Sequence, residues 1–393
     1  MPTASALIIT PIESTAGFGA FLDGVDLNNL AEHDFKQLER ALYTHKLLVI
    51  RDQPNLDPKK QFELVKRFDP TATPVHGHGS AAQIKQNASQ QKNKKNLVGA
   101  NPGVPNEPMV RMIGRATLPV GYHGATEEIT LTGGTHKGFH KEPLTDDEIE
   151  QGVSRFHRWH IDAALYNTHP PKVTALWAHK LPSGPPITVQ WDVSTAAPQS
   201  LVAKPGLTAF LDSSAMYDSL SPEDKEWVNY SEVEYAPHPY LWIQDSKATD
   251  DAFSLVSEGK ETTEGELPPV TESAIKRYKM VWRNPLTNEP SLQVHAIVAR
   301  RLFIRRSPTE DFKVIEDVVE VREILYKLQK PFLRPENILV SPQGEGDLCL
   351  WHNRSLRHTA IEYPSSYPDR IMHQVHVAGS DDPGNPVMLE AAA

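Results

Sequence analysis

Residues 158–162 read Arg-Trp-His-Ile-Asp and place a histidine and a carboxylate two positions apart. In an extended strand, residues i and i+2 project from the same side, so His160 and Asp162 can bind one ion together. His358 lies far downstream in a polar cluster and supplies a third candidate ligand. Two histidines and one carboxylate on one face of a metal leave positions open for a co-substrate and dioxygen, as in non-haem Fe(II) oxygenases.

A His-x-Asp pair alone is weak evidence, because most histidines are structural or surface groups and this chain has 17 of them. Residues 140–142, His-Lys-Glu, offer a second pair with the same spacing, but they lie in a loop rich in Gly, Lys and Pro. One face of an expected strand carries Phe156, Arg158, His160 and Asp162. This context favours His160 and Asp162 as the metal-binding pair.

The chain after His358 adds a cation. Following a turn at 364–368, residues 370–377 read as a strand, and alternation puts Arg370, Met372, Gln374 and His376 on one side. A cation followed by polar groups suits an interior that binds an anion, and the guanidinium fork of arginine suits a planar carboxylate. A polar edge that faces solvent is the alternative reading.

Composition excludes several classes of function. The net charge is −10 and charges of both signs are interleaved, so neither nucleic acid nor an anionic membrane is an expected partner. No targeting segment or run of about 18 apolar residues is present, which predicts a cytoplasmic protein. The single cysteine, Cys349, excludes an intrachain disulfide and reads as a small buried thiol.

The 33 prolines suit short strands, turns and long loops, so we expect one domain, 1–393, that is mainly β with flanking helices. The expected core is a double-stranded β-helix, or jelly roll. Apolar spacing predicts helices at 31–44 and 316–329, and capping residues predict helix starts at Asp57 and Ser221.

Three segments have compositions that predict little packing. Residues 79–96 are rich in Gln, Asn, Lys and Ala and read as a mobile loop, either a lid or an insertion without function. Residues 244–268 read as a surface excursion, and residues 380–393 as a flexible tail.

A resemblance covers nearly the whole chain. Segments 19–27, 48–53, 281–285 and 291–295, with the Trp-His-x-Asp and Trp-x-Asn-Arg-x3-His motifs, resemble the taurine/2,4-dichlorophenoxyacetate dioxygenase superfamily of Fe(II)/2-oxoglutarate-dependent oxygenases. Within this superfamily, RWHIDAALY and VEYAPHPYLW are most similar to segments of the fungal xanthine dioxygenases.

The resemblance implies roles for five residues. His160, Asp162 and His358 match the iron ligands. Arg370 matches the arginine that binds the C5 carboxylate of 2-oxoglutarate, and Thr188 matches a threonine that hydrogen-bonds the same carboxylate. The implied cofactor and co-substrates are therefore Fe(II), 2-oxoglutarate and dioxygen.

The chain departs from the xanthine enzymes at positions that face substrate or co-substrate. By this resemblance, Thr132 stands at the position where the xanthine enzymes carry a lysine that assists 2-oxoglutarate. Gln374 fits their substrate-site glutamine, whereas His376 takes the place of an asparagine and Arg111 that of an uncharged polar residue. The sequence therefore indicates the reaction class more firmly than it indicates the substrate.

The sequence predicts an oxygenase that couples decarboxylation of 2-oxoglutarate to succinate with oxidation of a small polar molecule, a xanthine-like purine first. One alternative is the same chemistry on a small amino acid or other carboxylate, by hydroxylation or ring closure in fungal secondary metabolism. Another is a non-redox binding barrel of the cupin type, which needs neither Arg370 nor Thr188. Homo-oligomers remain possible, and no macromolecular partner is expected.

Overall fold

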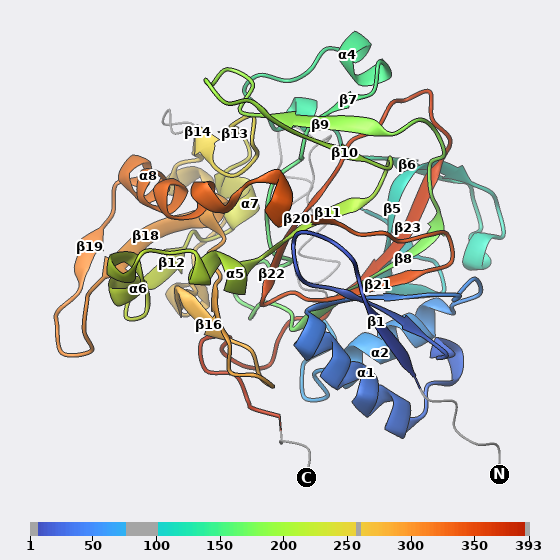
Figure 1. Cartoon of the computed structure of the whole chain (residues 1–393), viewed down its shortest axis with the longest axis horizontal. Coiled ribbons are helices and arrows are strands. Elements are labelled where there is room, and N and C mark those ends of the chain that lie inside the picture. The colour runs from blue at the N-terminus through green and yellow to red at the C-terminus, as the bar shows by residue number, and fades with distance from the viewer. Residues whose placement is uncertain (1–6, 76–100, 257–260, 390–393) are drawn as a thin grey trace.

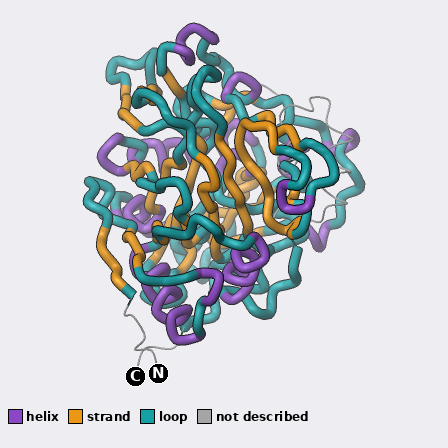
Figure 2. The backbone as a smooth tube through the Cα atoms, turned by 90° about the vertical axis from the view of Figure 1, so that its right-hand side faces the viewer, coloured by secondary structure: helices purple, strands orange, loops and turns teal. Residues whose placement is uncertain are grey.

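The computed structural model describes residues 7–75, 101–256 and 261–389 (Figure 1). Strands dominate the centre of the molecule and the few helices lie around it (Figure 2). The expected class, mainly β with flanking helices, is confirmed. Among the described residues, no helix combines the length and apolar character needed to cross a membrane.

A nine-stranded sheet spans the described residues from the N-terminal region to the C-terminal one. Its order is β1 (Ile8–Pro11), β2 (Ala20–Asp23), β3 (Leu47–Ile50), β21 (Leu348–His352), β8 (Val173–Lys180), β23 (Arg370–Val375), β5 (Glu107–Leu118) and β4 (Gly103–Val104), with β6 (Ile129–Thr132) also paired to β5. Strands β21, β8 and β23 are antiparallel neighbours, so segments distant in sequence meet at its centre.

Two three-stranded sheets complete the core. One has the order β10 (Gln199–Ala203), β9 (Ile187–Trp191), β7 (Val153–Ser154), and the other β20 (Ile338–Val340), β11 (Thr208–Asp212), β22 (Leu356–Ala360). Apolar residues join the second sheet to one face of the large sheet, here called the inner face. This inner cluster includes Leu176, Phe210, Cys349, Leu356 and Met372, and Cys349 is the buried free thiol that the sequence predicts.

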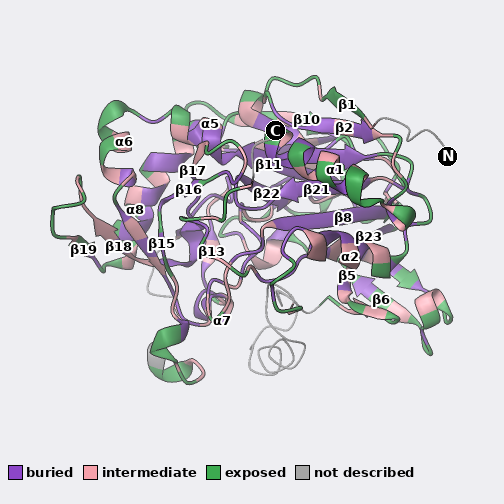
Figure 3. Ribbon diagram, turned by 90° about the horizontal axis from the view of Figure 1, so that it is seen from below, coloured by how far each residue is buried: buried purple, intermediate pink, exposed green. Residues whose placement is uncertain are grey.

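Helices cover the opposite, outer face of the large sheet. Helix α1 (Glu32–His45) packs apolar side chains against β3 and β21, and α2 (Pro58–Arg67) packs against β5 and β8. Both helices turn their polar sides outward (Figure 3). Asp57 caps α2 by accepting a hydrogen bond from the amide of Lys59 at 2.9 Å, with Pro58 in the first turn. Both expected helices are therefore present.

A further layer lies beside the sheets, at the left of Figure 1. It comprises the sheet β15 (Arg277–Lys279), β12 (Glu232–Tyr235), β18 (Ala299–Ile304), β19 (Lys313–Ile315), the hairpins β13 (Lys247–Ala248) with β14 (Leu255–Val256) and β16 (Val281–Arg283) with β17 (Pro290–Leu292), and helices α5 (Ser213–Asp218), α6 (Pro222–Val228), α7 (Pro239–Trp242) and α8 (Val318–Gln329). Helix α4 (Asp146–Glu150) lies apart from this layer and contacts β7. Ser221 caps α6, as the sequence predicts, and α8 begins two residues later than expected because Asp317 is its N-cap.

The three segments with unusual composition differ in outcome. Residues 79–96 lie outside the described residues. The described part of 244–268 is not uniformly exposed, since Ala252 and Phe253 are buried. They belong to a large apolar cluster that the further layer shares with β9 and β11, here called the apolar cluster of the further layer. Within 380–393, Asp381 binds Arg354 at 2.7 Å and the amide of Leu389 donates to the carbonyl of Pro285, while the flexibility of this segment stays a prediction.

Candidate functional site

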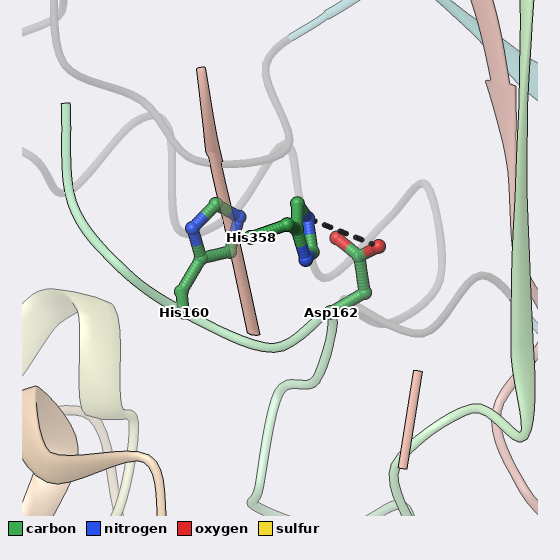
Figure 4. A group of neighbouring side chains, drawn as sticks. All are labelled: His160, Asp162 and His358. Carbon is green, nitrogen blue, oxygen red and sulfur yellow. Dashed lines mark ion pairs between the residues drawn. The ribbon is translucent and has the colours of Figure 1, made fainter. Parts of the chain in front are cut away.

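Three side chains converge as the sequence predicts. Ligand atoms of His160, Asp162 and His358 all lie within 4.8 Å of one another (Figure 4), and no other group of this kind occurs among the described residues. Asp162 and His358 are buried, and Nε2 of His358 lies 3.5 Å from Oδ2 of Asp162. Two imidazoles and one carboxylate are the donor set that suits non-haem Fe(II), whereas the segment 140–142 forms no such group.

Backbone pairing brings the two histidines together. His160 and His358 form an isolated antiparallel bridge in which each amide donates to the other residue's carbonyl at 3.0 Å. Their rings lie 4.2 Å apart between centroids. Nδ1 of His160 lies 2.8 Å from the carbonyl oxygen of Arg158, so Nδ1 donates and Nε2 is left as the metal-binding nitrogen.

The expected regular strand around His160 is not present. Phe156 bridges Ile361 and His160 bridges His358, so four steps along one segment oppose three along the other. One extra residue is the signature of a β-bulge, which reverses the side-chain alternation. Phe156 is consequently buried in the apolar cluster with Trp159, on the opposite side from His160, and the expectation that all four residues share one face is wrong for Phe156.

Asp162 is held at both its backbone and its carboxylate. Its amide donates to Oδ1 of Asn353 at 2.8 Å, and Nδ2 of Asn353 donates back to its carbonyl at 2.9 Å. Thr174 donates its hydroxyl to Oδ2 of Asp162 at 2.7 Å. Burial alone would raise the pKa of Asp162, but the imidazoles of His358 and His376 hold that pKa well below its usual range. The carboxylate is therefore charged and oriented before a metal arrives.

His376 lies next to the candidate metal ligand Asp162. It is fully buried, and its Nε2 lies 3.8 Å from Oδ1 of Asp162. It comes directly after β23, on the same side as Arg370 and Gln374 by the alternation that the sequence predicts. A contact between His376 and substrate stays a prediction.

Arg370 faces inward at the start of β23. Met372 packs in the inner cluster while Ile371 and Val375 pack on the outer face, which confirms the predicted alternation. Nε of Arg370 donates to the carbonyl of Gly206 at 2.6 Å, and within the described residues no carboxylate forms an ion pair with its guanidinium. Burial lowers the pKa of Arg370, as expected for a buried cation that lacks a counter-anion.

Gly206 makes room for this arginine. Its φ is +70°, and a Cβ at this position would lie 3.1 Å from Cδ of Arg370 and 2.5 Å from Cγ of Pro182. A larger residue would therefore be strained and would push against the side chain that is expected to bind 2-oxoglutarate.

The two threonines with expected co-substrate roles differ in their surroundings. Thr188 is half-buried in β9, on the side opposite Ile187 and Val189, which pack into the further layer. Thr132 is exposed at the end of β6, opposite Arg115 of β5. The structure brings neither into hydrogen-bonding contact with Arg370, so both roles stay predictions.

Arg111 and Gln374 are direct neighbours. They are cross-strand partners between β5 and β23, so their side chains lie on the same face. Nε of Arg111 is buried and has no hydrogen-bond partner among the residues that the structure describes, and burial lowers the pKa of its guanidinium. An amide that can donate and accept thus adjoins a half-buried cation.

Sequence reasoning missed two positioning residues. Asn353 stands in the Trp-x-Asn-Arg-x3-His motif, and that motif could have identified it. Thr174 reads as an ordinary strand threonine, and its bond to Asp162 depends on how β8 passes behind the site. No sequence signal pointed to it.

Comparisons with known proteins agree with this geometry. The family model "Taurine catabolism dioxygenase TauD, TfdA family" matches residues 113–376. The chain is 38% identical to the alpha-ketoglutarate-dependent xanthine dioxygenase xanA of Emericella nidulans, covering 97% of this chain and 98% of that protein. It is 39% identical to xan-1 of Neurospora crassa, named likewise, covering 96% and 88%. The predicted resemblance is confirmed.

The chain is also similar to a dioxygenase that is not named for xanthine and to solved structures. The alpha-ketoglutarate-dependent dioxygenase bsc9 of Alternaria brassicicola is 34% identical, covering 95% of this chain and 93% of that protein. Among solved structures, AAD-2 in complex with Mn(II) and N-oxalylglycine has a TM-score of 0.56 at 17% identity, covering 96% of this chain and all of that one. The chain is an enzyme, and it belongs to the TauD/TfdA family of dioxygenases.

Proposed function

We propose that this enzyme oxidises a small polar substrate, a xanthine-like purine first, at iron held by His160, Asp162 and His358. Iron bound there would use dioxygen to couple decarboxylation of 2-oxoglutarate to succinate with oxidation of the substrate. The observation that carries the proposal is the three-ligand group, in which Asp162 and His358 are buried, together with an inward arginine that has no counter-anion among the described residues.

The chain's own residues divide the work of binding. Arg370 would pair with the far carboxylate of 2-oxoglutarate, with Thr188 as a weaker donor to it and Thr132 near the place of the family's lysine. The double-stranded β-helix core is part of the same proposal, because the inner cluster already joins the large sheet to β11 and β22. Facing sheets of this kind present several strands to one enclosed site.

The substrate is proposed from the pair Gln374 and Arg111. An amide matches the alternating donors and acceptors on the edge of a purine such as xanthine. The relatives named for xanthine support this choice. Arg111 supports the second candidate, a small amino acid or other carboxylate, because a half-buried guanidinium favours an anion and no described carboxylate pairs with this one.

A substrate panel tests the proposal. The purified enzyme with Fe(II), ascorbate and 2-oxoglutarate is given xanthine or single amino acids, and succinate is measured with and without each compound. Formation of urate from xanthine, in equal amount with succinate from 2-oxoglutarate, supports the purine. Succinate that appears with an amino acid and not with xanthine would refute the purine. An enzyme that does not bind 2-oxoglutarate, with or without any of these compounds, would refute the reaction class.

A further inference from the structure

A third arginine lies beside the metal ligands. From residue 158 onward the side chains alternate regularly: Trp159, Ile161 and Ala163 all pack in the apolar cluster of the further layer. Arg158 therefore points to the same side as His160 and Asp162. Its backbone is tied to both halves of the site, since its carbonyl accepts from His160 and its amide donates to the hydroxyl of Thr359 at 3.2 Å.

The guanidinium of Arg158 has a support but no counter-anion. It lies over the ring of Phe139, 4.1 Å from the ring centre. Its Nε is buried without a hydrogen-bond partner, and no ion pair joins it to a carboxylate among the described residues. A ring face attracts a cation but accepts none of its hydrogen bonds in the plane of the fork. The donors of Arg158 are therefore available to a ligand.

The neighbours of Arg158 do not supply the missing negative charge. Tyr240 interacts with both Arg158 and Asp162, but its hydroxyl donates to the carbonyl of Ala163 at 2.7 Å, and burial raises its pKa far above neutrality. Burial lowers the pKa of His157 to about 4, so that ring is neutral at physiological pH. Burying a guanidinium without an anion is costly, which indicates that a ligand brings the anion.

We propose that Arg158 is a specificity-determining residue that binds a planar anionic group of the primary substrate, with Phe139 holding its guanidinium in place. This inference rests on the proposed function and names the charge class of its substrate. It reconciles the two candidates, because xanthine loses a ring proton in mildly alkaline solution and carries a delocalised negative charge, and a carboxylate carries one throughout. A planar anion fits the guanidinium fork by two parallel hydrogen bonds.

The co-substrate is the less suitable partner for Arg158. Arg370 already offers a buried cation for the far carboxylate of 2-oxoglutarate. Its near carboxylate would be a ligand of the iron itself. The experiment separates the two possibilities by measuring substrate and co-substrate binding in the same variants.

Binding is measured without oxygen, so that no turnover occurs. Wild type, Arg158→Met and Arg158→Lys are loaded with Fe(II) and 2-oxoglutarate, and calorimetry gives the dissociation constants of xanthine, L-alanine and benzoate in mildly alkaline buffer. Absorbance of the iron complex gives the dissociation constants of Fe(II) and 2-oxoglutarate. The matched control is Arg67→Met, because Arg67 lies over Phe35 at the same distance of 4.1 Å but in the α1–α2 region.

The proposal expects Arg158→Met to weaken the tightest-bound probe by roughly 30-fold or more, and Arg158→Lys to weaken it less, while iron and 2-oxoglutarate bind as in wild type. Arg67→Met should leave all constants unchanged. If wild type and Arg158→Lys bind the probes equally well, the guanidinium fork is not needed and the proposal is overturned. If Arg158→Met does not fold, Arg158→Lys still tests the fork, because it keeps the positive charge.

Other results would overturn the proposal. Weaker 2-oxoglutarate binding with unchanged probe binding would assign Arg158 to the co-substrate. A wild type that binds none of the three probes would show that its fork takes no planar anion. A different result would overturn the proposed function itself, namely a wild-type protein that binds neither Fe(II) nor 2-oxoglutarate.

Discussion

Asn353 grips Asp162 at both of its peptide groups, by accepting a hydrogen bond from its amide at 2.8 Å and donating one to its carbonyl at 2.9 Å. The same side-chain nitrogen also donates to the carbonyl of Pro171 at 3.0 Å. Asn353 itself is fully buried. The position of the carboxylate in the three-ligand group thus depends on a neutral amide that is not itself one of the candidate ligands.

Replacing Asn353 should weaken iron binding without removing a ligand. Asn353→Leu removes the hydrogen-bond partner of three backbone groups, the amide and carbonyl of Asp162 and the carbonyl of Pro171, at a cost of about 1–3 kcal/mol each. Loss of a residue that orients a ligand lowers metal affinity roughly 10- to 100-fold. Titration with Fe(II) and thermal melting measure the two effects. Thr174→Val should show a smaller loss of affinity that Thr174→Ser restores, and equal affinity in all variants would contradict this account.

Removing a metal ligand should abolish activity. His160→Ala or Asp162→Ala leaves two protein ligands, so iron content and succinate formation should both fall to background. Glu142→Ala, in the exposed part of the competing pair, is the matched control and should behave as wild type. Near-normal turnover with normal iron content in either site variant would show that the metal is bound elsewhere.

Arg370→Ala should raise the Michaelis constant for 2-oxoglutarate steeply. Loss of one partner of a buried charge pair costs about 2–5 kcal/mol, or roughly 30-fold to several thousand-fold in affinity. Thr188→Ala should act in the same direction more weakly, since a hydrogen bond to a charged group contributes about 1.5–3 kcal/mol. Initial rates at varied 2-oxoglutarate give both constants. An unchanged constant in Arg370→Ala would mean that another cation binds the co-substrate.

The double variant Arg111→Gln with His376→Asn should favour xanthine over an amino acid. It removes one permanent and one conditional positive charge and gives the pocket uncharged polar groups. The ratio of kcat/KM for xanthine and for the best amino acid, in wild type and variant, measures the change. A ratio that moves toward the amino acid would refute a role for these two residues in selecting charge.

Acid should destabilise the protein because two buried histidines must gain a proton. Burial lowers the pKa of His352 from 6.5 to about 3, and that of His373 to about 3. Because these folded-state values lie below the unfolded value, the stability is complete above pH 6.5 and is lost progressively as the pH falls toward 3. Denaturant unfolding between these limits measures the slope, and His352→Gln should reduce it. A slope that is the same in His352→Gln would exclude His352 as a contributor.

Regular spacing made some features predictable. The pair at 160 and 162 and the alternation from Arg370 to Val375 follow from strand periodicity, and the structure has both. Phe156 was misplaced because a bulge adds a residue that hydrophobic pattern does not record. Thr174 was missed because its contact crosses between segments, and Ala252 and Phe253 were hidden in a polar stretch whose burial depends on tertiary packing.

The reciprocal backbone bonds between His160 and His358 also bear on the order of events during synthesis. The two histidines are residues 160 and 358, so a growing chain lacks the second imidazole until about 200 further residues have followed the first. The two imidazoles can therefore come side by side only after both segments have been made, because the peptide groups that carry the rings hold each other.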